Sequence, residues 1–406
     1  MSAILDKLLK GQKVEWKTLD EIATKISSGG TPRTGVADYY NGDIPWLRTQ
    51  EINFDEIWDT GVKITKEGLQ NSSAKMIPEN CVIIAMYGAT VGKVGINKIP
   101  MATNQACANI QLNEDLANYR YVFHFLMSKY QFIKSLGTGS QTNINAQIVK
   151  NLEIPVPPLD VQAEIVRILD AFTAVTAELT AELTAELNMR EKQYQYYRDK
   201  LLTFSDNEII WKSLGELGQL IRGNGLQKSD FTEDGFPAIH YGQIYTFYGT
   251  FADKTKSFVS ENLAKKLKKA QNGDVLLAGT SENIQDVMKP LGWLGNEIAI
   301  SGDMFAYRPN TELDTKYLTY LLQTTEFQKY KEKYAHGTKV TRLNAEKFLK
   351  FDIAIPPLDE QKRIANILDK FETLTHSITE GLPKEIALRQ RQYEYYREQL
   401  LDFAKN

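Results

Sequence analysis

Two stretches of the chain, "IPVPPLDVQAEIVRILDAF" at residues 154–172 and "IAIPPLDEQKRIANILDKF" at residues 353–371, share one pattern of prolines, leucines and isoleucines. They align without a gap. The alignment continues at the same offset to "QYQYYRDKLLTF" at 193–204 and "QYEYYREQLLDF" at 392–403. An ungapped match of this length indicates that the chain is an internal duplication.

Each repeated segment is predicted to be a long helix. Paired prolines at 157–158 and 356–357 break the chain just before each segment. Apolar residues then recur at spacings of three and four, which is typical of an amphipathic helix. A helix over 159–202 would be about 66 Å long at 1.5 Å per residue, too long for the inside of one domain. We therefore expect the two helices to pair with each other, the alternative being two unrelated amphipathic helices. Gly381, Leu382 and Pro383 predict a break or kink in the second helix.

The first helix contains a perfect repeat, "TAELTAELTAEL" at 176–187. Ala, Glu and Leu favour helix, and four residues add about 6 Å and 400°. One unit can therefore be added or removed while the apolar stripe is kept, which predicts a spacer. The alternative is replication slippage that a helix tolerates. The spacer candidates are the first threonine of the repeat and its three leucines: Thr176, Leu179, Leu183 and Leu187.

Weaker matches upstream of each helix divide the chain into four parts. "NCVIIA" at 80–85 resembles "GDVLLA" at 273–278, and "EWKTLDEI" at 15–22 resembles "IWKSLGEL" at 210–217. We expect variable domains at 1–156 and 206–355, and helical segments at 157–205 and 356–406. The predicted fold class is α+β: two α/β domains joined by two long antiparallel helices, a coiled coil, with an internal pseudo-two-fold repeat.

The totals of the sequence restrict its class. The chain has 406 residues and a net charge of -3, so a basic bias over the whole chain is missing and any DNA-binding cations must be clustered. The two cysteines, Cys81 and Cys107, match no metal-binding spacing and indicate a reducing compartment. No apolar run is long enough to predict a membrane span, and no signal peptide is recognised, so a cytoplasmic protein is expected.

Together these motifs closely resemble the specificity subunit of type I restriction–modification systems. The resemblance includes "GGTPRTGVADYYNGDIPW" at 29–46, "YGATVGKVGI" at 87–96 and the two "IPxPPLxxQ" segments, and it covers nearly the whole chain. The tetrapeptide repeats and the "QYxYYRxxLLxF" motifs resemble the subfamily with TAEL repeats in its central conserved helix.

The resemblance implies a non-catalytic subunit with two target-recognition domains, each reading one half of an interrupted DNA target. The helices would set the spacing and dock two modification subunits, which hold S-adenosylmethionine and methylate adenine. Restriction subunits would add ATP- and Mg-dependent translocation and cleavage, so no cofactor, metal or catalytic residue is expected in this chain. The alternative function is a helical scaffold that does not bind DNA.

Candidate DNA-binding residues are polar side chains of the two variable domains, because base readout uses Arg, Lys, Asn, Gln, Ser and Thr. In the first domain they are Arg33, Arg48, Thr49, Gln50, Lys93, Asn104, Gln105, Ser140 and Gln141. In the second domain they are Arg222, Asn224, Lys228, His240, Tyr241, Gln243, Lys339 and Arg342. The clustered lysines Lys265, Lys266, Lys268 and Lys269 are expected to contact phosphates, or else to form a solvated helix face.

Partner-binding candidates are aromatic and arginine residues that recur near the two helix ends, since both types are enriched at interface hot spots. They are Tyr194, Tyr197, Arg198, Tyr393, Tyr396 and Arg397, and packing against a neighbouring domain is the equal alternative. Asn145 and Asn344 also recur, which indicates a cap or turn. The stretch "CVIIAMYGATVGKVG" lacks the spacing of a phosphate-binding loop and is expected to be a hairpin turn.

Overall fold

The chain divides into two compact units, each described here by itself. The computed structural model describes residues 2–137, 143–205, 209–337, 339–377 and 380–405. Unit 1 comprises Met1–Thr180 and Leu388–Asn406, and unit 2 comprises Ala181–Ala387. Both repeated helical segments are thus divided between the units, whereas the sequence suggested four consecutive parts. The reason is that each helix contributes its two ends to different cores.

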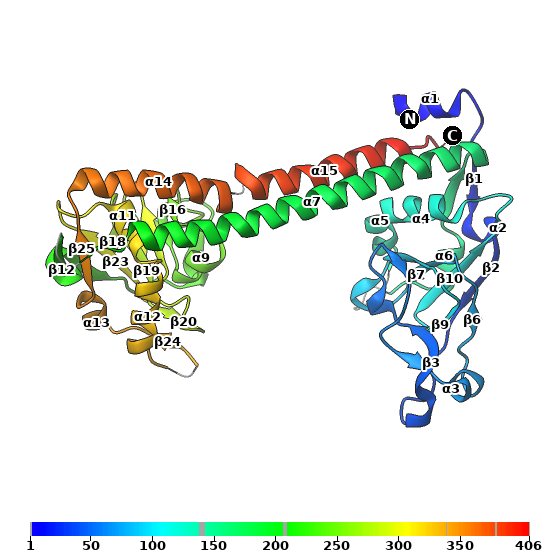
Figure 1. The fold of residues 1–406 in the computed structure, drawn as a ribbon, viewed down its shortest axis with the longest axis horizontal. Helices are drawn as coiled ribbons and strands as arrows, with labels where there is room; N and C mark the ends of the chain where they lie inside the picture. The colour runs from blue at the N-terminus through cyan, green and yellow to red at the C-terminus, as the bar shows by residue number, and fades with distance from the viewer. Residues whose placement is uncertain (1, 138–142, 206–208, 338, 378–379, 406) are drawn as a thin grey trace. The chain divides into compact units, whose positions relative to one another are not determined.

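Unit 1 is built on a five-stranded sheet with a smaller four-stranded sheet (Figure 1). The larger sheet has the order β2 (Ala23–Ser28), β10 (Cys107–Leu112), β7 (Val82–Ala85), β8 (Val94–Asn97) and β4 (Glu56–Ile57). The smaller sheet has the order β5 (Lys63–Ile64), β3 (Tyr40–Leu47), β9 (Met101–Thr103) and β6 (Met76–Ile77). Helices α4 (Tyr119–Ser128) and α5 (Tyr130–Ser135) belong to the main core of this unit.

Unit 2 repeats this plan. Its first sheet has the order β13 (Gly218–Arg222), β23 (Met304–Pro309), β19 (Val275–Ala278), β21 (Pro290–Trp293) and β16 (Phe251–Ala252). Its second sheet has the order β14 (Phe231–Thr232), β17 (Ser257–Val259), β15 (Phe236–Ile239), β22 (Ile298–Ile300) and β18 (Lys269–Ala270). Helices α11 (Thr315–Leu321) and α12 (Thr325–Tyr334) correspond to α4 and α5.

The matched "VIIA" and "VLLA" segments form the middle strands β7 and β19, and every residue of both is buried. A strand that has neighbours on both sides and lies in a covered sheet favours a continuous run of apolar residues. This shared requirement explains why the two segments resemble each other in sequence. In each unit a two-stranded ribbon also precedes the helix: β1 (Glu15–Thr18) pairs with β11 (Glu153–Val156), and β12 (Ile210–Ser213) pairs with β25 (Asp352–Ile355). The predicted internal repeat is confirmed in the main sheet and in this ribbon, whereas the second sheet has four strands in unit 1 and five in unit 2.

The first long helix, α7, runs from Leu159–Leu201 and has 43 residues, as predicted to within one residue. The second is interrupted, with α14 (Leu358–His376) followed by α15 (Gly381–Leu401), so the predicted break is confirmed. Gly381 has φ of +76°, and a Cβ there would lie 2.5 Å from the carbonyl oxygen of Thr373. Glycine is therefore required at this position.

Within each unit, the C-terminal end of one helical segment packs against the N-terminal part of the other. In unit 1, Leu400 and Leu401 of α15 share a core with Ile165 and Leu169 of α7. In unit 2, Tyr194 of α7 shares a core with Ile364 and Leu368 of α14, and so does Leu202 just beyond the end of α7. In both units the last turns of one helix therefore lie against the first turns of the other. This arrangement confirms the predicted antiparallel pairing.

The TAEL repeat lies inside α7, as predicted. Its leucines Leu179, Leu183 and Leu187 are half-buried, whereas Glu178 and Glu182 are exposed. Glu186 forms an ion pair with Arg190 at 2.7 Å, one turn further along the helix. The repeat therefore keeps one apolar stripe and one charged face.

Candidate nucleic-acid interface

A buried glutamine fixes each domain to the start of its helix. Gln162 donates from Nε2 to the carbonyls of Leu116 and Pro157, at 3.0 and 2.8 Å, and accepts from the N–H of Asn118 at 2.8 Å. Gln361 makes the same three hydrogen bonds in unit 2, with the backbone of Glu312, Pro356 and Asp314. Both side chains are fully buried, so every bond satisfies a polar group that has lost water.

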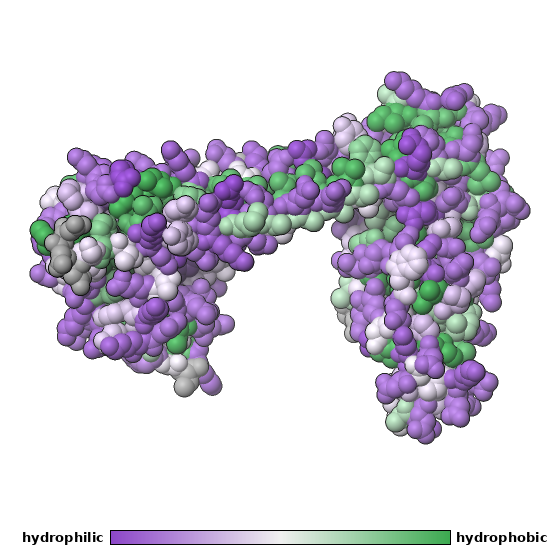
Figure 2. Space-filling view, viewed as in Figure 1, coloured by the Kyte–Doolittle hydropathy of each residue, from purple (hydrophilic) through white to green (hydrophobic). Residues whose placement is uncertain are grey.

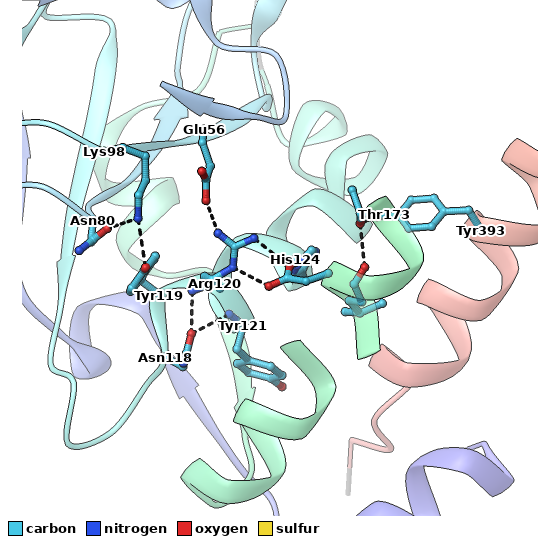
Figure 3. Close-up of polar contacts among 12 residues, drawn as sticks. Glu56, Asn80, Lys98, Asn118, Tyr119, Arg120, Tyr121, His124, Thr173 and Tyr393 are labelled. Carbon is cyan, nitrogen blue, oxygen red and sulfur yellow. Dashed lines mark hydrogen bonds and ion pairs between the residues drawn. The ribbon is translucent and has the colours of Figure 1, made fainter. Parts of the chain in front are cut away.

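Asp170, two turns further along α7, binds helix α4 of unit 1 through Arg120 and His124, and Figure 3 shows these two side chains close together. Arg120 binds Asp170 through two nitrogens, each at 2.8 Å, and also contacts Glu56. His124 Nε2 lies 2.8 Å from the same carboxylate. Burial alone would raise the pKa of Asp170, but hydrogen bonds from His124 and Arg120 outweigh it and lower the pKa to about 2.

Asp369 has the same position in unit 2 with different partners. Lys316 lies 2.6 Å from its carboxylate, and the hydroxyl of Tyr320 donates to it at 2.7 Å. Burial, and then the hydrogen bond to Asp369, raise the pKa of Tyr320. In each unit the β-sheet domain is thus attached to its helix by one glutamine and one aspartate, and both residues lie in the repeated segment.

The arginines of unit 2 separate into two groups. Four of the six form ion pairs inside the unit: Arg190, Arg198, Arg308 and Arg363. Among the described residues, Arg222 and Arg342 have no acid within ion-pair distance. Both are exposed, and both line one hollow of about 430 Å³. Two cations left unpaired at one hollow indicate a site for an external ligand.

Strand ends bring these two residues together. Arg222 ends β13 and pairs with Phe305 of β23, and Arg342 pairs with Thr280 in a short ribbon between β20 (Thr280–Ser281) and β24 (Thr341–Arg342). Asp303 lies just before β23, and its carbonyl accepts from the N–H of Gly279 at 2.8 Å. Gly223 allows the end of β13 to lie close to the turn before β23, because a Cβ at this position would lie 2.1 Å from the carbonyl oxygen of Ser301.

Several predicted DNA-binding residues of unit 2 are engaged within the unit. Asn224 binds the backbone of Lys266 and Lys268, at 3.0 and 2.6 Å. His240 is buried and is the N-cap of α9 (Tyr241–Thr246), and its backbone N–H donates to Gln243 Oε1. Burial, and then Lys228, lower the pKa of His240. These contacts favour structural roles for Asn224, His240 and Gln243.

The remaining predicted residues of unit 2 are more accessible. Lys265, Lys266 and Lys268 are exposed, whereas Lys269 pairs with Glu297 at 3.4 Å. Lys228 and Lys339 are exposed as well. Tyr241 is half-buried, with its ring 4.5 Å from that of His240. DNA contact remains a prediction for this accessible group.

In unit 1, Arg33, Gln50 and Gln105 are exposed, and Gln105 Oε1 accepts from Thr31. Arg48 pairs with Glu51 at 3.3 Å, and the carbonyl of Thr49 accepts from Thr90 at 2.9 Å. The carboxamide oxygen of Asn104 accepts from Ala106 and Cys107, which gives it a structural role. Ser140 and Gln141 lie outside the described residues.

Lys93 follows the predicted hairpin turn. Strands β7 and β8 pair antiparallel around Gly88–Thr90, so the turn is confirmed. Lys93 Nζ donates to Asn53 at 2.7 Å. Among the residues that the structure describes, no group of three His, Cys, Asp or Glu side chains could hold a metal ion. In the same residues, no helix has the length and apolarity needed to cross a membrane.

Among the predicted partner-binding residues, the four tyrosines contact the other helical segment, whereas the two arginines lie over tyrosines of their own helix. Tyr194 is only 3% exposed and packs on Phe371 and His376. Tyr197 stacks on Phe371, and the hydroxyl of Tyr393 lies 3.0 Å from that of Thr173. Tyr396 stacks on Phe172, and Arg198 and Arg397 lie over Tyr194 and Tyr393. These contacts are packing between the two helical segments, closest for the buried Tyr194, and partner binding stays a prediction for the other residues. Asn145 and Asn344 are helix N-caps, as predicted.

The structure adds residues that the sequence reasoning missed. Gln162, Gln361 and the aspartates Asp170 and Asp369 are identical in both halves, so the alignment itself contained a signal for them. Asp303 carries no such signal, because only folding brings it beside Arg222. Hydrophilic residues cover most of the visible face of each unit, with apolar residues in smaller patches (Figure 2).

A family model described as "Type I restriction modification DNA specificity domain" matches residues 12–189 and 208–388. The chain is 33% identical to a putative type I restriction enzyme specificity subunit of Haemophilus influenzae, over 98% of each protein. It is also 33% identical to a type I restriction enzyme specificity subunit of Escherichia coli, over 99% of this chain and 97% of that protein.

Solved structures share the fold. One, from a study of complex assembly and conformational transition of the type I restriction–modification system, aligns with a TM-score of 0.72 at 19% identity and covers 96% of this chain and 98% of its own. The HsdS subunit from Thermoanaerobacter tengcongensis aligns with a TM-score of 0.54 at 18% identity and covers 97% of this chain and 96% of its own.

Proposed function

Because the chain belongs to the family of type I restriction–modification DNA specificity subunits, we propose that each of its two units reads one half of an interrupted DNA target. Specificity subunits are the non-catalytic members of these systems, and this chain is one of them. Its task is therefore to select the sequence at which partner subunits act.

The observation that carries this proposal is the contrast between the two units. They share the order of the main sheet and the glutamine and aspartate attachments, but their exposed polar residues differ. Unit 2 presents Arg222 and Arg342 at one hollow, whereas in unit 1 the strand β2, which corresponds to β13, is followed by Thr31, whose hydroxyl donates to Gln105. Equal scaffolds with different polar groups suit two different half-sequences.

The partners follow from the same reasoning. Double-stranded DNA would be contacted by the units, and two copies of a modification subunit would dock on the two equivalent helical regions. Restriction subunits would join that complex. S-adenosylmethionine, ATP and Mg would be held by those partners, with no cofactor on this chain, and the complex would act in the cytoplasm.

The test is to map methylated adenines in a host that carries this chain with its modification subunits. The expected result is one interrupted target with two unlike halves. Exchange of residues 209–355 for the same region of a related subunit should change one half only. A change in both halves, or the absence of sequence-specific methylation, would contradict the proposal.

A helical scaffold without DNA binding is the less favoured function. Such a scaffold would have no need of unpaired arginines at a hollow of a variable domain. Filter binding of the assembled complex to target DNA and to a scrambled duplex separates the two functions, because a scaffold would treat both duplexes alike.

A further inference from the structure

We propose that Arg222, Asp303 and Arg342 of unit 2 together contact a base edge in the DNA groove, with Asp303 as a specificity-determining residue. This inference rests on the proposed function and deepens it. The three side chains are exposed and line the same hollow of about 430 Å³. They reach it from the end of β13, the turn before β23 and the ribbon strand β24.

The three groups are available for a ligand. Arg222 makes one long hydrogen bond, from Nε to the carbonyl of Gly302 at 3.4 Å. The backbone of Arg342 forms two hydrogen bonds with the backbone of His336, at 3.0 and 2.9 Å. Its guanidinium lines the hollow and forms no ion pair with any of the described residues. In the same part of the chain, no cation lies within ion-pair distance of Asp303.

The carboxylate decides between a phosphate and a base. A phosphate offers only acceptor oxygens and a negative charge, so an unpaired carboxylate beside the arginines would repel it. The major-groove edge of a base pair offers acceptors, the purine N7 and the O6 or O4 oxygens, and also one amino donor. Two guanidinium groups and one carboxylate match such an edge.

The order of the strands supports this match. The backbone around Asp303 is linked to the segments of both arginines: Arg222 binds the neighbouring Gly302, and the N–H of Gly279, next to Thr280, donates to the Asp303 carbonyl, while Thr280 pairs with Arg342. The carboxylate would accept from the amino group, adenine N6 or cytosine N4, and the arginines would donate to the acceptors beside it.

The lysines of the same unit have a different character. Lys265, Lys266 and Lys268 are exposed, and Lys266 and Lys268 contribute only backbone atoms to Asn224. With no acid in ion-pair contact with these three among the described residues, they suit phosphates. They supply a matched comparison within one unit.

The experiment uses the assembled complex with its modification subunits and a duplex library randomised in the half-site of unit 2. Asp303→Asn keeps the shape of the side chain but replaces one acceptor oxygen with an amide donor. The variant can therefore accept a base that presents an oxygen where the preferred base presents an amino group. We expect discrimination to fall roughly 5- to 150-fold at one base position, and Arg222→Ala and Arg342→Ala to weaken selection at that position or the next. Relaxation at an adenine identifies N6 as the group read, and relaxation at a cytosine identifies N4.

Two controls keep the outcome clear. Lys266→Ala should lower the affinity for all sequences alike and reduce the salt dependence of binding. Asp234→Asn removes one negative charge at another exposed position, as Asp303→Asn does, and should leave the preference at every base position unchanged. If Asp303→Asn leaves every base preference unchanged while the wild-type complex remains selective, the inference is wrong and the proposed function stands. A wild-type complex without sequence preference would instead overturn the proposed function.

Discussion

The ring of Phe172 lies flat on the ring of Tyr396, with centroids 5.3 Å apart and planes within 7° of each other. In unit 2 the equivalent pair, Phe371 and Tyr197, has centroids 5.7 Å apart at 25°. Each pair joins the start of one helical segment to the end of the other. The duplication is therefore reciprocal: each half supplies the helix end that completes the core of the other half.

This stacking predicts the effect of two matched substitutions. Phe172→Ala and Phe371→Ala should each lower the free energy of unfolding by about 1–2 kcal/mol, less than for a fully buried ring because both rings are partly exposed. Thermal unfolding of the purified chain measures the loss. Phe172→Leu should retain more of the stability, and equal melting temperatures for Ala and wild type would show that the stacking contributes nothing.

The attachment of α4 to α7 predicts a dependence on pH. The folded pKa of Asp170, about 2, lies below its ordinary value of 3.8, so the charged carboxylate stabilises the fold. This contribution is fully present above about pH 4 and is lost as pH falls towards 2. Asp170→Asn should cost about 1 kcal/mol at neutral pH after allowance for solvent screening, and the difference should shrink in acid.

Urea unfolding at a series of pH values checks this prediction. Glu178→Gln removes an exposed carboxylate from the same helix and serves as the control. A deficit of Asp170→Asn that stays constant down to pH 2 would show that shape, and not charge, holds the helix.

A buried lysine predicts the opposite pH window. Lys331 of α12 is 4% exposed and donates to the carbonyl of Gln285. Burial lowers its pKa from 10.5 to about 8, so between these values the unfolded chain binds more protons. Stability should therefore rise with pH from about 8 to 10.5, and the cost of the buried charge is fully present below pH 8.

Lys331→Met should remove this rise, because the substitution keeps the length of the side chain without its charge. Lys329→Met, at an exposed position of the same helix, should leave the rise intact. Chemical denaturation across pH 7–11 measures both variants. A wild-type stability that does not change over this range would contradict the assigned pKa.

The repeat in α7 predicts a change in target spacing. Deletion of residues 180–183 removes one TAEL unit, which shortens a helix by about 6 Å and turns it by a net 40° or so. One base pair advances about 3.4 Å and turns about 34–36°. The variant should therefore recognise the same two halves with a gap shorter by about one base pair.

Mapping of methylated adenines reads out that gap directly. Insertion of one TAEL unit should lengthen the gap by the same step. Insertion of a single alanine after Leu183 should instead reduce methylation, because it turns the following apolar residues by about 100°. New half-sequences in the deletion variant would show that the repeat is no spacer.

The sequence by itself determined the duplication, the long helices, the break at Gly381 and the family. These properties depend on local periodicity, on proline and glycine, and on identical residues, all of which are readable along the chain. Recurrence also predicted a cap or turn role for Asn145 and Asn344, and the structure shows both as helix N-caps.

Tertiary structure decided which polar residues are available. Asn224 and His240 looked equivalent to Arg222 in the sequence. In the structure the side chain of Asn224 binds two backbone groups and that of the buried His240 accepts from the N–H of Gly242, whereas the exposed Arg222 makes one long hydrogen bond, at 3.4 Å. The tertiary structure also decided that Asp303 lines one hollow with two arginines distant in sequence, and that Tyr194 is part of a core. The physical reason is that hydrogen-bond partners and burial depend on contacts between strands and helices far apart in the chain, which local patterns do not encode.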